Sequence, residues 1–104
     1  MEWLTAPGDD GYMDVKMKGD CDLYAAPSFA SAMLERIAAG ARRLRLDLSG
    51  VDYLDSTGVG ALIRILQAAR RSGCELRFRG IAGSPRKVLR MSNILVLMRE
   101  DVRS

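Results

Sequence analysis

The chain has 104 residues, of which 48% are hydrophobic and 28% charged, and this composition is typical of one globular domain rather than of a disordered segment. Sixteen Lys and Arg residues against thirteen Asp and Glu give a net charge of +3, which is too small to indicate a nucleic-acid partner by itself. The absence of histidine excludes a Ser-His-Asp triad and a His-ligated zinc site.

The N-terminal part of the chain predicts a strand after an irregular start. Residues 1–11 contain Pro7 and two glycines, so they predict either irregular backbone or a short edge strand. Apolar and charged residues alternate over residues 13–18, which predicts a strand with one buried face. Residues 19–22 then predict a turn.

A helix is predicted after this turn. Pro27 suits the first turn of a helix because its missing N–H is not needed there. Phe29, Met33 and Ile37 recur at helical spacing and define the expected buried face. Gly40 predicts the end of the helix.

The middle of the chain predicts a second strand and the clearest helix. Leu44, Leu46 and Leu48 alternate with charged residues, and Ser49-Gly50 interrupts this pattern before the chain reaches the helix. The helix begins near Thr57, and Gly73 predicts its end. Its apolar stripe consists of Val59, Leu62, Ile63, Leu66 and Ala69.

The C-terminal part predicts a strand, a short helix and a further strand. Residues 74–79 alternate as the earlier strands do. Ser84 predicts a cap for a helix over residues 85–91. The apolar run 94–98 predicts a last strand, and residues 99–104 a polar tail.

Strands and helices alternate in this order, which favours parallel pairing with right-handed crossovers. Charged residues alternate with apolar ones in each strand, whereas a sheet covered on both faces has nearly continuous apolar strands. We therefore expect one α/β domain over residues 1–104, with a mixed, mainly parallel sheet of four or five strands and helices packed on one face.

The motif Asp55-Ser56-Thr57-Gly58-Val59-Gly60 joins the second of these strands to its helix. Side-chain oxygens of Asp, Ser and Thr accept the free N–H groups of a helix's first turn, and the helix dipole stabilises a phosphoryl group placed there. Capping alone needs one such residue. This chain has three in a row, followed by two glycines that each weaken a helix by about 1 kcal/mol. Close approach at this end of the helix would explain them.

Other chemical interpretations of the same residues are weaker. An aspartic protease needs a second carboxylate at its site, a dinucleotide fingerprint needs a glycine where Ile63 stands, and a P-loop needs a lysine. Asp20, Asp22 and Asp55 offer three carboxylates, but a hard cation takes six or more oxygen ligands. We therefore expect neither a catalytic residue nor a metal ligand here.

Two cysteines without a secretory signal, Cys21 and Cys74, predict buried free thiols in a reducing compartment. The N-terminus lacks a basic region followed by an apolar run, and no window approaches the roughly 18 apolar residues of a membrane span. We expect a cytoplasmic protein without a membrane partner.

The outward positions of the strands predict a basic sheet face. An RNA-binding platform would need aromatic residues between the basic ones, and these are missing, so a solvated face is the favoured interpretation. The face consists of Lys16, Lys18, Arg43, Arg45, Arg77 and Arg79.

Three blocks of sequence carry a resemblance to a known family. They are Gly19-Asp20-Cys21-Asp22-Leu23-Tyr24-Ala25-Ala26-Pro27, Leu46-Asp47-Leu48-Ser49-Gly50-Val51 and Leu54-Asp55-Ser56-Thr57-Gly58-Val59-Gly60-Ala61-Leu62. In this order they resemble the STAS domain, and specifically the bacterial anti-sigma factor antagonists, from about Val15 to about Leu97. The first block departs from the family at Asp20 and Cys21, where a Glu and an aliphatic residue are usual. The resemblance implies a small α/β domain with helices on one side of its sheet.

The same resemblance implies a regulatory binding protein rather than an enzyme. Ser56 would be phosphorylated by an anti-sigma factor that is also a serine kinase, the unphosphorylated form would bind that partner and free a sigma factor, and a phosphatase would remove the phosphate. Asp55 and Thr57 would shape the helix entry, and they would share the partner-binding surface with Asp22, Gly58 and Gly60. ATP would belong to the kinase, so no cofactor is expected here.

Two alternatives remain open. In the first, the chain is a STAS subunit of a lipid-transport or stress-sensor assembly. In the second, it is a small nucleic-acid-binding module that uses the basic sheet face.

Overall fold

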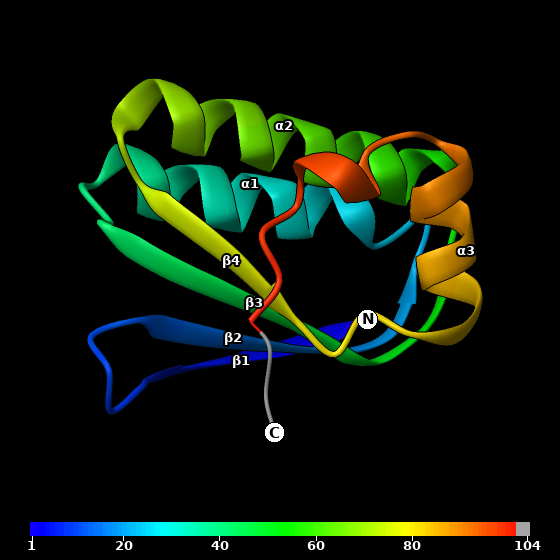
Figure 1. Cartoon of the computed structure of the whole chain (residues 1–104), viewed down its shortest axis with the longest axis horizontal. Coiled ribbons are helices and arrows are strands. Elements are labelled where there is room, and N and C mark those ends of the chain that lie inside the picture. Colours follow the sequence, from blue (N-terminus) through cyan, green and yellow to red (C-terminus); the bar gives the residue numbers. More distant parts are fainter. Residues whose placement is uncertain (102–104) are drawn as a thin grey trace.

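The computed structural model describes residues 1–101, in which four strands form one sheet in the order β1-β2-β3-β4 (Figure 1). Strand β1 pairs antiparallel with β2, and the other two pairings are parallel. The predicted mixed, mainly parallel sheet is confirmed, and the N-terminal segment is an edge strand. The strands are β1 (Glu2–Pro7), β2 (Met13–Cys21), β3 (Arg43–Leu54) and β4 (Glu75–Arg79).

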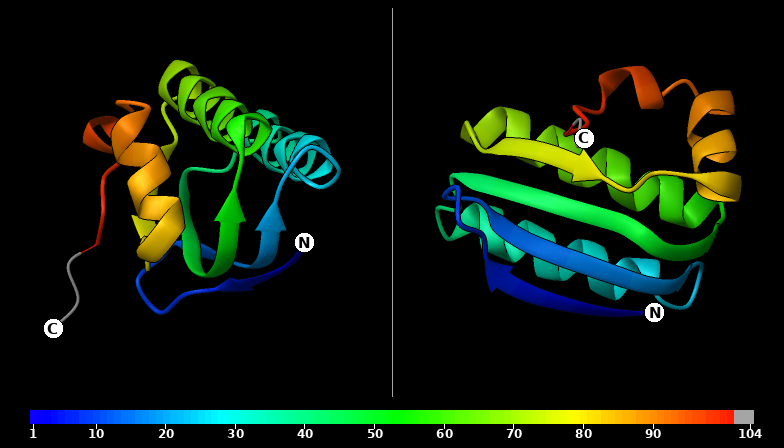
Figure 2. Two further views of the ribbon diagram at one scale, coloured as in Figure 1. Left: turned by 90° about the vertical axis from the view of Figure 1, so that its right-hand side faces the viewer. Right: turned by 60° about the horizontal axis from the view of Figure 1, so that its bottom comes forward.

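Helices α1 (Ala26–Ala38) and α2 (Ser56–Ser72) lie side by side on one face of this sheet (Figures 1 and 2). Helix α3 (Gly83–Met91) stands at the end of the sheet where α2 begins, and a short 3₁₀ helix, η1 (Leu95–Leu97), follows it. The helical ribbons leave the opposite face of the sheet uncovered, as the alternation in the strands predicts. None of the helices in residues 1–101 is long and apolar enough to cross a membrane.

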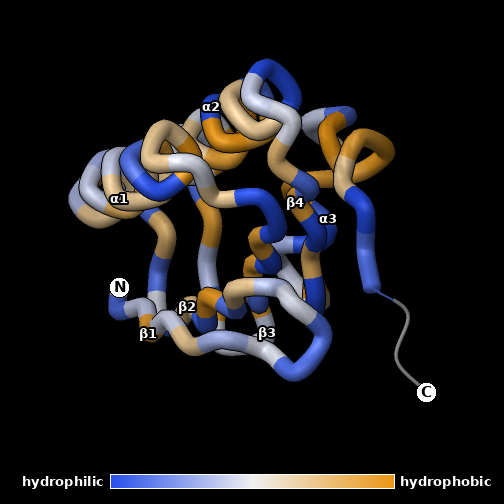
Figure 3. The backbone as a smooth tube through the Cα atoms, turned by 90° about the vertical axis from the view of Figure 1, so that its left-hand side faces the viewer, coloured by the Kyte–Doolittle hydropathy of each residue, from blue (hydrophilic) through white to orange (hydrophobic). Residues whose placement is uncertain are grey.

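The core lies between the sheet and the two long helices. Leu44, Leu46 and Leu48 of β3 are buried against the helices, together with Phe29 and Met33 of α1. Hydrophobic and hydrophilic colours alternate along the strands in Figure 3. In α2 the buried positions include Ala61 and Ile65, whereas the predicted core residues Ile63 and Leu66 are only partly buried.

Strand β2 is longer than predicted. Gly19, Asp20 and Cys21, expected in a turn, continue the strand and pair with Val51, Tyr53 and Leu54 across two irregularities in register. The pairing is possible because β3 does not break at Ser49-Gly50: a side chain at Gly50 would place its Cβ 2.7 Å from the carbonyl oxygen of Met17. Glycine thus lets the two backbones approach and carries both strands to the motif.

The predicted strand over residues 94–98 is wrong. Ile94 and Met98 are buried, but Leu95–Leu97 form a 3₁₀ turn between them that leaves Val96 84% exposed. A short run of apolar residues indicates burial, but it does not show whether every second residue or every fourth is buried. Here the two buried residues, Ile94 and Met98, lie four positions apart. The outer edge of β4 instead carries a single parallel bridge between Phe78 and Glu100. Ser84 is also not the cap of α3, because the helix begins one residue earlier, at Gly83.

The predicted solvated basic face is wrong at Arg45, which is only 4% exposed. Its guanidinium is paired with the carboxylates of Asp10 and Asp14, and its Nη1 lies 2.9 Å from Asp101 Oδ2. Arg77 also reaches Asp101, at 3.4 Å. A buried guanidinium needs such partners, and the carboxylates come from two distant stretches of the chain, residues 10–14 and Asp101.

Residues 99–101 of the predicted polar tail contact the sheet. Asp101 is anchored on the arginines of the open sheet face, and its N–H donates to the carbonyl oxygen of Phe78. The rest of that prediction, residues 102–104, lies outside the described residues.

Candidate functional site

Asp55 fixes the junction between β3 and α2. Its backbone is extended at the N-cap, and its Oδ1 accepts a hydrogen bond from the N–H of Gly58 at 2.9 Å. Its Oδ2 accepts from the N–H of Leu23 at 3.0 Å. One carboxylate therefore caps α2 and ties the loop after β2 to the start of that helix.

Asp22 organises the loop that faces this junction. Its Oδ1 accepts hydrogen bonds from the N–H groups of Tyr24 and Ala25, at 3.0 and 3.1 Å. Its carbonyl oxygen accepts from the N–H of Ala26 at 2.8 Å, which starts α1. The side chain acts as a local turn former, a common role of Asp in loops.

The two glycines of the motif have different surroundings. A Cβ at Gly58 would lie 2.6 Å from Cδ1 of Leu54 and would collide with the carbonyl oxygen of Cys21. The predicted close approach is thus confirmed at Gly58, where the helix packs on the end of β2. At Gly60 a Cβ would meet nothing within 4 Å, so this glycine answers no packing need in residues 1–101.

Ser56 is the first residue of α2 and is exposed, and Thr57 beside it is half-buried. In the part of the chain that the structure describes, their backbone N–H groups donate to no backbone acceptor outside the helix, and Ser56 Oγ has no side-chain hydrogen bond to a base. An anion on its hydroxyl would lie at the positive end of the helix dipole.

Four acidic residues lie in or directly after the ends of β2 and β3. Asp20 and Asp52 are exposed and Asp22 and Asp55 are half-buried. Their field contributes to the high pKa of the neighbouring Cys21 thiol, which burial chiefly, and Asp55 and Asp22 secondarily, raise to about 11. Among residues 1–101 these carboxylates form no cluster that could hold a metal ion.

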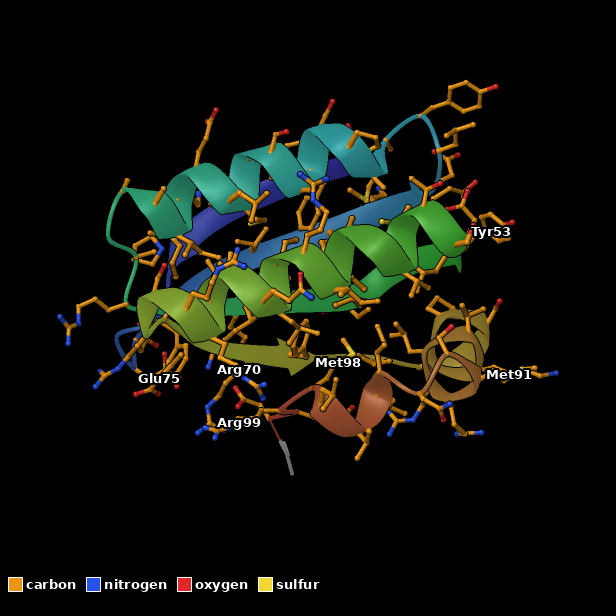
Figure 4. The ribbon with its side chains drawn as sticks, turned by 90° about the horizontal axis from the view of Figure 1, so that it is seen from above. Tyr53, Arg70, Glu75, Met91, Met98 and Arg99 are labelled. Carbon is orange, nitrogen blue, oxygen red and sulfur yellow. The ribbon has the colours of Figure 1, made fainter. Side chains whose placement is uncertain are left out.

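The structure adds three exposed apolar residues that the sequence reasoning missed. Tyr24 is 88% exposed, and Leu23 and Tyr53 are 60% and 50% exposed. Figure 4 shows Tyr53 beside the first turn of α2. The sequence does contain a signal for them. Each is an aromatic or aliphatic residue close after an aspartate, and none belongs to the repeating pattern of a buried face. Large exposed side chains around a polar centre are typical anchors of a protein interface.

The hydrogen bond from Leu23 to Asp55 brings the loop that contains Asp22 to the Asp55–Gly60 motif, at one end of the sheet. The predicted free thiols are confirmed, since Cys21 and Cys74 are both buried and unpaired among the described residues.

Comparison with known proteins agrees with this architecture. A curated relative from Staphylococcus aureus, named anti-sigma-B factor antagonist, is 27% identical over 89 residues, which are 86% of this chain and 82% of the relative. A solved anti-sigma factor antagonist from Mycobacterium paratuberculosis has a TM-score of 0.81 at 19% identity, over 98% of this chain and 86% of that one.

The solved structures of SpoIIAA include two chemical states. The unphosphorylated form has a TM-score of 0.75 at 12% identity, over 99% of this chain and 90% of that one. The phosphorylated Bacillus form has a TM-score of 0.74 at 16% identity, over 98% of this chain and 93% of that one. At these identities the likeness shows the fold. The family is established by a sequence match: residues 4–103 match the family model described as STAS domain. The chain belongs to the STAS domain family.

Proposed function

We propose that this protein is an anti-sigma factor antagonist whose binding is switched by phosphate on Ser56. The unphosphorylated form binds an anti-sigma factor with serine kinase activity and releases a sigma factor. The observation that carries this proposal is the placement of an exposed, unactivated serine at a helix N-terminus, inside a rim of exposed apolar and acidic residues. The names of its relative and of its structural neighbours support the same reading.

The physical effect of the phosphate is different inside the domain and at its surface. Phosphorylation adds about −1.5 to −2 charge at pH 7. Within the domain, the dipole of α2 and the free N–H groups of its first turn stabilise that charge. SpoIIAA, with the same fold in both phosphorylation states, is consistent with a modification that leaves the domain intact.

At the surface, the phosphate opposes binding. It places charge and bulk beside Asp55 and near Asp22, on the patch that Leu23, Tyr24 and Tyr53 form. A partner that packs against these residues must then accept a doubly charged group with acidic neighbours. Phosphate on Ser56 therefore weakens binding by repulsion and lost fit, without a change of fold.

The remaining residues of the motif have assigned roles in this proposal. Asp55 and Asp22 hold the two loops in register through the hydrogen bonds described above. Thr57 and Gly58 shape the first turn of α2, and Gly60 leaves open space that the partner occupies. ATP belongs to the kinase, and a phosphatase acting on phospho-Ser56 resets the switch. The protein acts in the cytoplasm as a binding protein and not as an enzyme.

Two other functions are less well supported. A STAS subunit of a lipid-transport or stress-sensor assembly would use the same surface for docking without a sigma factor. A nucleic-acid platform on the open sheet face would need free cations, but Arg45 is buried in ion pairs and Arg77 and Arg79 both face Asp101.

The test is transfer of phosphate by the serine-kinase anti-sigma factors encoded in the same genome. Each kinase is incubated with ATP and the protein, and the intact mass is measured for wild type, Ser56→Ala and the matched control Thr57→Val. We expect one phosphate on wild type and on Thr57→Val and none on Ser56→Ala. Phosphate on all three proteins, or on none of them with any of these kinases, contradicts the proposal.

A further inference from the structure

A second surface lies at the other end of α2, far from Ser56. Between α2, β4 and η1 runs a groove of about 470 Å³, here called the β4 groove. Its apolar lining includes Ile63, Leu66, Leu76 and Leu97, and Arg70 and Arg99 also line it. Arg70 is fourteen residues beyond Ser56, which corresponds to about 20 Å along the helix.

Leu76 of β4 lines this groove and is 7% exposed. Phe78 uses its outward N–H and carbonyl groups to pair with Arg99 and Asp101 of the C-terminal segment. Because outward backbone groups recur every second residue, those of Leu76 point to the same side. Within residues 1–101 no segment pairs with Leu76 there, since the chain turns away into η1. An unpaired strand edge is a template for another extended segment.

The walls of the groove are apolar and partly exposed. Leu97, which lines the groove, is 58% exposed on η1, and Ile63 and Leu66 are only partly buried on α2. An added strand would direct alternate side chains toward these walls, because successive side chains of a strand point to opposite faces.

The groove is lined by two arginines and one carboxylate, so its net charge is positive. Arg70 of α2 and Arg99 of the C-terminal segment both line the groove, and Figure 4 labels them on these two elements. Within the described residues neither is in an ion pair. Glu75 also lines the groove, and its Oε2 accepts a hydrogen bond from the hydroxyl of Tyr12 at 2.7 Å. A second copy of the chain would bring the same arginines against each other, which disfavours self-pairing.

We propose that the β4 groove is a docking site for an extended segment of a partner protein, with alternating apolar and acidic residues, that adds a strand at Leu76. Main-chain hydrogen bonds to Leu76 give affinity, the apolar side chains fill the groove, and the acidic ones pair with Arg70 and Arg99. The site is independent of the Ser56 surface and does not rest on the proposed switch.

The experiment uses the full chain and a defined probe, an acetylated eight-residue peptide of alternating leucine and glutamate. Binding is followed by fluorescence anisotropy of the labelled peptide and by amide chemical shifts of the isotope-labelled protein. We expect saturable binding, with the largest shifts at Leu76 and Leu97 and none at Ser56. Shifts centred on Ser56, or no binding at millimolar protein, overturn the proposal.

Two matched controls separate strand addition from general attraction. The double variant Arg70→Glu, Arg99→Glu should bind the peptide roughly fivefold or more weakly than wild type. The control Arg64→Glu, Arg71→Glu has the same change of net charge outside the groove, and its affinity for the peptide should change little. A peptide with N-methylated leucines should lose binding. Equal loss in both double variants, or tight binding of a lysine-for-glutamate peptide, refutes the proposal. A dimer in sedimentation that the first double variant abolishes would assign the groove to a second copy instead.

Discussion

Two glycines in the same helix should respond in opposite directions to the same substitution. Gly58→Ala adds a methyl group where Cδ1 of Leu54 would be 2.6 Å away and the carbonyl oxygen of Cys21 closer still. Gly60→Ala adds the same group where no atom lies within 4 Å. Both positions have ordinary helical backbone, so no strain from a positive φ enters the comparison.

The magnitudes follow from two competing terms. Alanine in place of glycine inside a helix stabilises it by about 1 kcal/mol. At Gly60 this gain is kept, and we expect about 0.5–1 kcal/mol of added stability. At Gly58 the gain is opposed by overpacking of about 1–3 kcal/mol. The upper end applies because the Cys21 carbonyl is fixed by β-pairing and also accepts the N–H of Asp55. The net effect is a loss of about 1–2 kcal/mol.

The assay is unfolding by urea and by heat, followed by circular dichroism and by the fluorescence of Trp3. This indole packs edge-on against Phe29 of the core, with ring centroids 5.2 Å apart, so its emission reports on tertiary structure. The two variants should differ by about 2 kcal/mol, which is roughly 8–16 °C in Tm for a domain of this size. Wild type should lie between them.

If Gly58→Ala is as stable as Gly60→Ala, the close packing at Gly58 does not decide its stability. A Gly60→Ala protein that is less stable than wild type would show that open space at this position does not decide its stability. If Gly60→Ala is more stable and yet binds the anti-sigma factor more weakly, the space beside it belongs to the partner, as proposed.

Three further predictions concern single side chains. Asp55→Ala removes the cap of α2 and the bond to the loop after β2, and should lower the free energy of unfolding by about 1–2 kcal/mol in urea titrations. Hydrogen bonding to Arg45 chiefly lowers the pKa of Asp10 from 3.8 to about 2, so its contribution to stability is fully present above about pH 4 and lost as the pH falls through 2. Urea titrations from pH 6 to pH 2 should show this part of the acid dependence in wild type and not in Arg45→Met; equal pH dependence in both would contradict the pairing. Burial chiefly raises the pKa of the Cys21 thiol to about 11, so at pH 8 iodoacetamide should modify it in urea but not in the folded protein, as measured by intact mass.

The sequence predicted the elements whose pattern is set by one buried face. A few residues are enough to show such a pattern. The predicted buried face is confirmed for a strand at Leu44, Leu46 and Leu48 and for a helix at Phe29, Met33 and Ile37. The run Ile94–Met98 was read wrongly because apolar residues without a clear period are compatible with a strand, a helix or a 3₁₀ turn.

Contacts between distant segments could not be read in the same way. Arg45 looked like a solvated strand residue, and nothing near it in the sequence shows that Asp10 and Asp101 meet it. At the candidate site the motif itself was visible, because capping chemistry is local. The exposed Tyr24 and Tyr53 were missed, because exposure depends on how two separate loops are placed.

We propose that phosphate on Ser56 decides whether the partner binds. The most direct measurement is the affinity of the kinase anti-sigma factor for the protein before and after phosphorylation, by titration calorimetry without ATP, with circular dichroism on both forms. We predict the same fold in both forms and an affinity lower by about a hundredfold or more for the phosphorylated one, since like charges brought together in an interface cost several kcal/mol. Equal affinity of the two forms would contradict the account.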